Sequence, residues 1–212
     1  MITRFGLAPR KAGFTVDRFQ QHWRERHGAV IGVLPGLRRY WQNHAVAGTG
    51  LPWPGFDACS EMDADDVAAF DTVFAEPHYL TAGRADERRF VDRSGGGAVL
   101  TERVAGTPPA EPGGVRLLTL MRGAPDVATG DLAAVLGAPG RGGAATAVEA
   151  FVRLPGPLGI VDAVEALWFP SADAALGHVT SEAAEVDRRA LAGRVAATER
   201  VLATVHVVPL GV

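Results

Sequence analysis

The 212-residue sequence predicts an α+β protein built from two ferredoxin-like βαββαβ halves. A segment rich in proline and glycine, residues 106–114, separates two stretches of similar length. The same order of strand-like and helix-like patterns occurs on both sides of it, and short similarities recur at a spacing of roughly one hundred residues. We therefore expect one domain over residues 1–105 and a second, degenerate one over residues 115–212.

Local patterns justify each element in turn. Phe19 and Trp23, four residues apart, predict a helix over 14–33 that ends before a Leu-Pro-Gly turn, and alternation predicts a strand over 37–46. The other elements expected in the first half are strands over 2–7, 57–63 and 98–104 and a helical stretch over 65–90. The second half is expected to hold strands over 115–121, 145–154, 161–169 and 201–208, a short helix over 131–136 and a helical stretch over 172–198.

The composition excludes several classes of protein. Hydrophobic residues make up 47% of the chain and charged residues 21%, which is typical of a globular protein with a packed core. The net charge of −3 argues against a nucleic-acid partner. Cys59 is the single cysteine, so no intramolecular disulfide is expected, and the sequence has no stretch apolar enough to span a membrane. We expect a cytoplasmic protein, and the sequence leaves open whether it forms a homodimer.

The run from Phe19 to His44 carries the highest density of reactive side chains. It holds three of the six histidines, two of the four tryptophans and one of the two tyrosines. The corresponding parts of the second half have no such residues, and His178 and His206 lie elsewhere. We therefore expect one site per chain, built mainly by the first half.

Spacing argues against a metal site in this run. His22 and His27 are five residues apart, which places them about 140° apart around an α-helix. Helical metal ligands are spaced three or four residues apart, and no Cys/His cluster completes a ligand set. We expect no metal.

The strand over 37–46 offers two alternative sets of site residues. Tyr40 and His44 share one face with Gln42, and Trp41 and Asn43 share the opposite face with Arg39. On the next strand, Glu61 is costly to bury unless it is functional or paired, and we weigh an ion pair with Arg4 slightly above contact with a substrate.

The run Phe19–His44, the following Phe56-Asp57-Ala58 and the later Phe90-Val91-Asp92 resemble an EthD domain. This resemblance covers residues 1–105 well, and the rest only in the order of its elements. It implies an intrachain dimeric α+β barrel, with a pocket for a small hydrophobic molecule between sheet and helices. We expect no cofactor. By resemblance, the candidate catalytic residues are His27, Tyr40 and His44. The candidate substrate-binding residues are His22, Trp23, Trp41, Asn43 and Glu61.

The resemblance and the histidines favour a cofactor-free enzyme that acts by proton transfer on a cyclic or polyketide-derived substrate. In that interpretation, His27 or His44 serves as base and acid, and Tyr40 stabilises an enolate. The alternatives are a cofactor-free monooxygenase of hydroquinone-like or anthrone-like substrates, which would use Trp41 and Asn43, and a module that binds a small molecule without catalysis.

Overall fold

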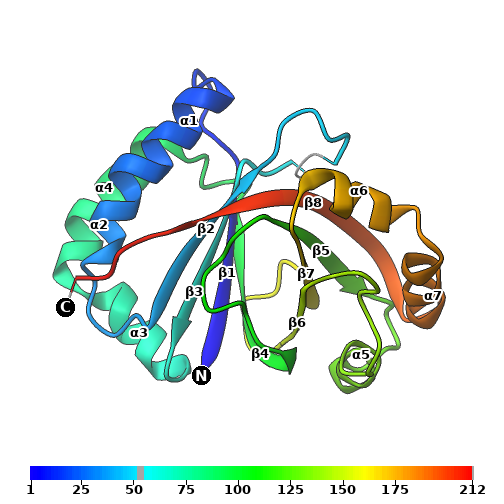
Figure 1. Ribbon diagram of the computed structural model, residues 1–212. Coiled ribbons are helices and arrows are strands. Elements are labelled where there is room, and N and C mark those ends of the chain that lie inside the picture. The colour runs from blue at the N-terminus through cyan, green and yellow to red at the C-terminus, as the bar shows by residue number, and fades with distance from the viewer. Residues whose placement is uncertain (52–54, 212) are drawn as a thin grey trace. The chain divides into compact units, whose positions relative to one another are not determined.

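The computed structural model describes residues 1–51 and 55–211, and its secondary structure follows the predicted order closely (Figure 1). In the first half the elements are β1 (Ile2–Ala8), α1 (Val16–His22), the π-helix η1 (Trp23–His27), α2 (Gly28–Gly32), β2 (Arg39–Ala45), β3 (Ala58–Ala64), α3 (Val67–Ala75), the π-helix η2 (Tyr79–Gly83), α4 (Arg84–Phe90) and β4 (Gly97–Gly106). In the second half they are β5 (Val115–Gly123), α5 (Thr129–Leu136), β6 (Ala147–Arg153), β7 (Ala163–Phe169), α6 (Ala172–Val179), α7 (Glu182–Leu191) and β8 (Val195–Val207).

The largest error in the predicted elements is at the end of the second half. We expected helix to continue to residue 198, but α7 ends at Leu191 and β8 begins at Val195. Gly193 adopts φ +75°, a left-handed conformation that ends helices and favours glycine. The Ala-Ala-Thr-Glu segment after it has little strand propensity, so strand pairing rather than local preference determines its conformation.

The predicted fold class, two ferredoxin-like units with separate sheets forming an intrachain dimeric α+β barrel, is wrong. The strands instead form one closed antiparallel barrel in the order β1-β3-β2-β8-β5-β7-β6-β4. Two open four-stranded sheets would leave unpaired strand edges, and closure removes them. The 10-residue β4 and the 13-residue β8 make this possible, and both are longer than the strands we predicted there.

The contacts within the chain divide it into two compact units whose limits cut through these long strands. Unit 1 comprises residues 1–44, 55–100 and 206–212, and unit 2 comprises residues 45–54 and 101–205. These limits differ from the expected domains, because the end of β8 belongs to unit 1 and the end of β4 to unit 2.

In unit 1, the helices between Val16 and Phe90 cover one face of β1, β3 and β2 (Figure 1). The register pairs Met62 of β3 with Arg4 of β1 and with Tyr40 of β2, so these three side chains lie on the same face. Met62 and Tyr40 pack with Ile31, which shows that this face meets the helices.

Unit 2 has its own core around β5, β7 and β6. Met121, Ala150 and Ala163 pack with Leu132 and Leu136 of α5, and Leu167 and Phe169 pack with Ala175 of α6. Every residue of β7 is buried, so this strand is covered on both faces. Among the described residues, no helix is long and apolar enough to cross a membrane.

Candidate active site

A layer of polar residues lies between the sheet and the helices of unit 1, with an apolar cluster at each end. One cluster contains Phe19, Trp23, Ala58 and Phe90. The other is larger and includes Ile31, Tyr40, Met62 and Tyr79. Each strand and helix that contributes to both clusters has polar residues or glycine between its two apolar ends.

The sequence shows this interruption in each element. On β3, Ser60 separates Ala58 from Met62, and on β1 Arg4 and Gly6 separate Ile2 from Ala8. On β2, Gln42 follows Tyr40 on the same face. On the helices, His27 lies between Trp23 and Ile31, and Asp86 lies between Tyr79 and Phe90. We call the set Gly6, Ser60, Gln42, His27 and Asp86 the central polar layer.

Asp86 joins the two helical histidines. Its Oδ1 lies 2.9 Å from His22 Nε2, and its Oδ2 lies 3.0 Å from His27 Nδ1. Our expectation that these histidines point in different directions is wrong because η1 is a π-helix. Its i→i+5 hydrogen bonds bring residues five apart to the same side of the helix.

The environment keeps Asp86 ionised. Burial alone would raise the pKa of the Asp86 carboxyl, but its hydrogen bonds with His27 and His22 outweigh burial and lower that pKa. The Phe90 ring packs against both imidazoles, with centroids 4.6 Å from His22 and 5.1 Å from His27. When the Asp86 carboxylate accepts a hydrogen bond from Nδ1–H of His27, the proton of the neutral ring stays on Nδ1. The Nε2 atom of His27 is then free to act as a base, as in other Asp–His pairs.

His44 is buried against Trp23, and glutamine side chains hold it in place. The His44 and Trp23 rings have centroids 4.6 Å apart. His44 Nδ1 lies 2.5 Å from Gln20 Oε1 and Nε2 lies 3.3 Å from Gln42 Oε1, so we assign the single proton of the neutral ring to Nδ1. Burial, with smaller contributions from Arg24 and His206, lowers the pKa of His44 to about 3. The ring is therefore neutral at physiological pH.

The low pKa of His44 predicts acid-sensitive stability. Its folded pKa of about 3 lies below the ordinary 6.5, so between these values the unfolded chain binds a proton that the native chain does not. Stability therefore rises with pH across this window, by up to roughly 4–5 kcal/mol from this residue alone. In urea denaturation, His44→Gln should flatten the dependence of the unfolding free energy on pH between pH 5 and pH 6.5, where the native ring stays neutral. An unchanged slope in this variant would contradict the assignment.

Tyr40 lies at the apolar end of the same strand face. Its hydroxyl accepts a hydrogen bond of 3.1 Å from Gln42 Nε2, which also donates to the Trp23 carbonyl at 2.8 Å. The pKa of Tyr40 is raised to about 12, mainly because its side chain is buried. Tyr40 is thus a neutral hydrogen-bonding group, and Gln42 connects it to the segment that carries the histidines.

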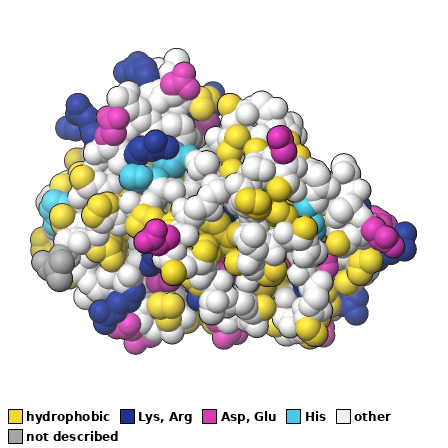
Figure 2. All heavy atoms as spheres, viewed as in Figure 1, with side chains coloured by type: hydrophobic (Ala, Val, Ile, Leu, Met, Phe, Trp, Pro, Cys, Tyr) yellow, Lys and Arg dark blue, Asp and Glu magenta, His cyan; other side chains and the backbone are white. Residues whose placement is uncertain are grey.

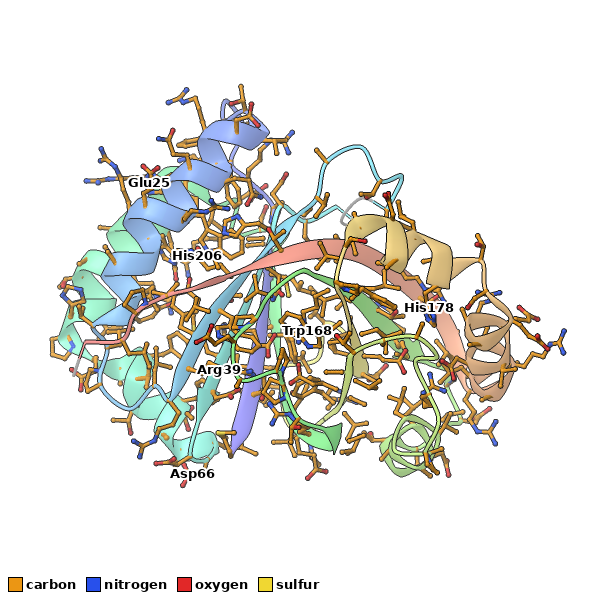
Figure 3. All side chains as sticks on the ribbon, in the orientation of Figure 1. Glu25, Arg39, Asp66, Trp168, His178 and His206 are labelled. Atoms are coloured by element: carbon orange, nitrogen blue, oxygen red, sulfur yellow. The ribbon has the colours of Figure 1, made fainter. Side chains whose placement is uncertain are left out.

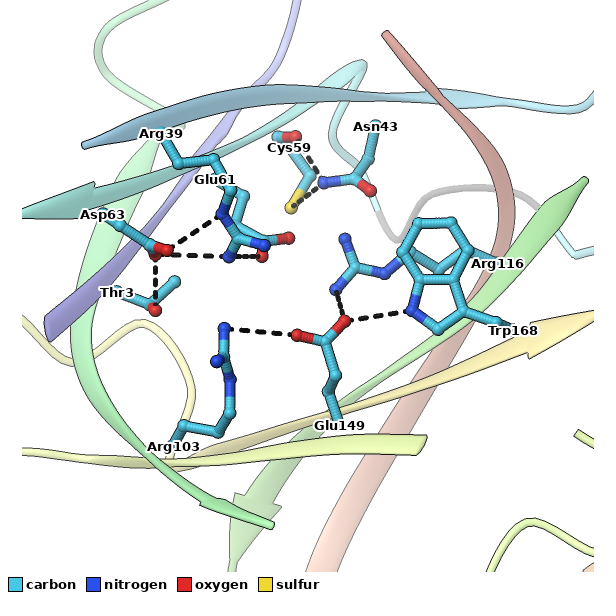
Figure 4. A network of polar contacts seen from close by, with 10 residues as sticks. All are labelled: Thr3, Arg39, Asn43, Cys59, Glu61, Asp63, Arg103, Arg116, Glu149 and Trp168. Carbon is cyan, nitrogen blue, oxygen red and sulfur yellow. Dashed lines mark hydrogen bonds and ion pairs between the residues drawn. The ribbon is translucent and has the colours of Figure 1, made fainter. Parts of the chain in front are cut away.

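The residues of the alternative set lie on the opposite face of the sheet. Arg39 stacks over Trp41 with its Cζ 3.9 Å from the ring centroid, and Asn43 Nδ2 donates to the Cys59 carbonyl at 3.1 Å. Glu61 is fully buried, and its ion-pair partner is Arg39, at 2.5 Å, rather than Arg4 as weighed from the sequence. Figure 4 shows this network, in which Asp63 also pairs with Arg39.

His22 connects the Asp86–His27 pair to the surface. It lines a concavity of about 330 Å³ together with Phe14, Arg18, Gln21, Glu25 and Arg26. His206, labelled on β8 in Figure 3, lies 6.2 Å from His44 between ring centroids. The pKa of His206 is lowered, mainly by burial, and the positive charge of Arg24 lowers it further. On the face drawn in Figure 2, histidine side chains adjoin those of Lys or Arg.

The sequence prediction gave no role to Asp86 or Ser60. It placed Gln42 only on the face of Tyr40, considered Arg4 only as a partner of Glu61, and set His206 aside. Asp86 lies in an exposed-looking run of charges, Arg-Ala-Asp-Glu-Arg-Arg, and only its place four residues before the buried Phe90 hints that it faces inward. Within the described part of the chain, no cluster of three or more His, Cys, Asp or Glu residues has the geometry to hold a metal ion.

Unit 2 has a polar cluster of its own, although we expected little chemistry there. Glu165 and His178 both line a void of about 20 Å³, roughly the size of one water molecule. Arg141 pairs with Glu165 at 2.7 Å and with Asp187 at 3.4 Å. Figure 3 labels His178 on α6, where its ring packs on Phe169. On the other face of β7, Glu149 pairs with Arg116 and Trp168 (Figure 4).

Comparison with solved structures shows similarity over almost the whole chain. A candidate monooxygenase from Lactobacillus acidophilus has a TM-score of 0.61 at 11% identity, covering 100% of this chain and 97% of its own. An anthrone oxidase-like protein has a TM-score of 0.70 at 10% identity, covering 98% and 93%. A candidate monooxygenase from Fusobacterium nucleatum has a TM-score of 0.60 at 9% identity, covering 98% and 92%. At these identities, the similarity concerns the fold.

A comparison with known protein families finds a match in the first half of the chain. No curated protein matches the chain. The matched family region contains the helical histidines, strands β2 and β3, and Asp86. Residues 11–94 match the EthD domain, which confirms the resemblance seen in the sequence.

Proposed function

We propose that this protein is an oxidoreductase of the monooxygenase type, which oxidises a small hydrophobic hydroquinone-like or anthrone-like compound with O₂ and without a bound cofactor. The observation that carries the proposal is that the Asp86 carboxylate, in the central polar layer, is hydrogen-bonded to both His22 and His27. The EthD match and the monooxygenase and anthrone oxidase-like neighbours support it.

The chemistry needs one base and O₂. An anthrone carries an acidic CH₂ group, and loss of one proton gives an electron-rich carbanion. The carbanion reduces O₂ and combines with it to form a C–O–O⁻ peroxide, which is then protonated. Loss of the second C–H proton, with cleavage of the O–O bond, releases water and leaves C=O. The balance is R₂CH₂ + O₂ → R₂C=O + H₂O.

His27 takes the role of base in this scheme. Its Nδ1 is held by Asp86, so Nε2 can accept the substrate proton and later return it to the peroxide. His27 is 8% exposed, and exclusion of water strengthens its interaction with a developing anion. Tyr40 and Gln42 supply neutral hydrogen-bonding groups on the face of β2 that packs against these helices.

Oxygen uptake tests the proposal. Wild-type protein incubated with anthrone should consume one O₂ for each anthraquinone formed, and ¹⁸O₂ should label the product carbonyl. His27→Gln should abolish this turnover while leaving the thermal unfolding midpoint nearly unchanged. If the wild-type protein and His27→Gln both consume O₂ no faster than anthrone without protein, the proposed oxygenase activity is refuted.

The same base could serve a second function, isomerisation or cyclisation by proton transfer, since that chemistry also begins with removal of a proton. Turnover of a lactone or polyketide-like substrate under argon would identify it. Recovery of unchanged ligand, bound but not converted in air or argon, would instead indicate a binding module.

A further inference from the structure

The surface concavity beside His22 is large enough to hold a small molecule. Its volume of about 330 Å³ falls within the range of small-ligand pockets, roughly 300–1,000 Å³. Of His22, Asp86 and His27, only His22 lines it. The concavity therefore gives a ligand from solvent access to one of the two histidines that share the Asp86 carboxylate.

The contact with Asp86 leaves His22 with a basic nitrogen. A carboxylate only accepts hydrogen bonds, so we assign the proton of the neutral His22 ring to Nε2, which lies 2.9 Å from Asp86 Oδ1. Within residues 1–51 and 55–211, no group is hydrogen-bonded to His22 Nδ1, and this atom is not sealed from solvent. Because Nε2 is turned inward to Asp86, we place Nδ1 on the side of the concavity.

An aromatic ring and two arginines form much of the remaining wall. Arg18, His22 and Arg26 recur every four residues along α1 and η1, and Phe14 precedes them at the same spacing. Arg18 Cζ lies 5.1 Å from the centroid of the Phe14 ring, and Phe14 meets His22 edge to face at 6.3 Å between ring centroids. Phe14 thus supplies apolar surface next to both a cation and the imidazole.

The charges around the concavity favour an anion. Arg18 and Arg26 both line it, and neither side chain takes part in an ion pair in the described parts of the chain. Glu25, labelled in Figure 3, is the acid among the lining residues, and Gln21 Nε2 binds its two oxygens at 3.3 and 3.2 Å. With His22 neutral, two arginines and one glutamate leave the concavity positively charged.

We infer that this concavity binds a phenolic ring compound, and that His22 Nδ1 removes the proton of its hydroxyl group. The O–H bond breaks, the proton bonds to Nδ1, and the electron pair stays on the phenolate oxygen, which Arg18 or Arg26 stabilises. A carboxylate ligand would bring no proton for Nδ1 to accept. The inference rests on the proposed function for its substrate class, and it gives hydroquinone-like compounds a base separate from His27.

A matched pair of probes tests this site without turnover. 2-Naphthol and 2-methoxynaphthalene share a ring system, but only the naphthol has a hydroxyl proton to lose. Under argon and near neutral pH, adding wild-type protein to 2-naphthol should produce the absorbance of naphtholate, which can be recorded separately in alkali. By titration calorimetry, the protein should bind the naphthol at least about tenfold more tightly than the methyl ether.

Three variants identify the base. His22→Gln should abolish the naphtholate absorbance, because the amide has no basic nitrogen. Glu25→Gln should retain it, since this change removes the negative charge that opposes the phenolate. His78→Gln is the matched histidine control and should also retain it, because His78 is exposed and its Nε2 lies 3.1 Å from the Val30 carbonyl.

Gln21→Trp provides a second test should His22→Gln fail to fold. Its side chain would fill the concavity without altering the contact between His22 and Asp86, and it should prevent naphthol binding. Absence of naphtholate with the wild type, equal absorbance with His22→Gln, or loss in Glu25→Gln alone would overturn the site. Naphtholate formation without O₂ uptake from anthrone would retain this site and refute the oxygenase, and O₂ uptake without naphtholate would refute this site alone.

Discussion

Asp86→Asn is expected to lower kcat for oxygenation by about 10³-fold or more. The asparagine amide keeps the size of the side chain but removes the charge that orients and polarises His22 and His27. One amide also cannot accept hydrogen bonds from both imidazoles, because one of its two polar atoms is a donor. O₂ uptake at saturating substrate measures the effect on kcat directly.

Asp92→Asn is the matched control for that variant. Asp92 is an exposed residue after the same helix, and its carboxylate accepts hydrogen bonds from Ser94. It should retain wild-type kcat. A normal kcat in Asp86→Asn, or an equal loss in both variants, would contradict the role given to Asp86.

The largest expected effect on stability comes from Gly106→Ala. Gly106 ends β4 with φ +71°, and an added Cβ would lie 1.6 Å from the carbonyl oxygen of Val148 on β6. Both the left-handed backbone and the backbone clash oppose alanine, so we expect a loss of more than about 3 kcal/mol in the free energy of unfolding. Urea denaturation of both proteins provides the measurement.

Gly113→Ala tests whether the loss of stability is specific to Gly106. Gly113 lies in the same connection between the halves, and its added Cβ would meet no atom within 4 Å. Its stability should stay within about 0.5 kcal/mol of wild type. A similar loss in both variants would mean that the connection as a whole, rather than the β4–β6 contact, is sensitive.

Most of the secondary structure could be predicted from the sequence because its patterns are local. The spacing of Phe19 and Trp23 indicated the first helix, and the alternation around Tyr40 indicated β2. Closure of the barrel could not be predicted in this way. It depends on pairing between distant strands, and the Ala-Ala-Thr-Glu segment that follows Val195 in β8 has no strand pattern of its own.

The candidate site was predicted only in part for a related reason. The histidines were visible in the sequence, but their common partner Asp86 lies 59 residues after His27. A π-helix then reversed the conclusion drawn from ideal α-helical geometry, that His22 and His27 diverge. Arg4 was considered only as a partner of Glu61, and the two lie on opposite faces of the sheet, which the pairing of Phe5 with Glu61 makes clear.

Formation of the substrate anion in the absence of O₂ tests the central claim most directly. We expect wild-type protein mixed anaerobically with anthrone near neutral pH to develop the absorbance of the anthrone anion, which can be recorded separately in alkali. Asp86→Asn and His27→Gln should show only neutral anthrone, and anthraquinone should form in the wild type once O₂ is admitted. Equal anion absorbance in all three proteins, or none in the wild type, would contradict the assignment of the Asp86–His27 pair as the base.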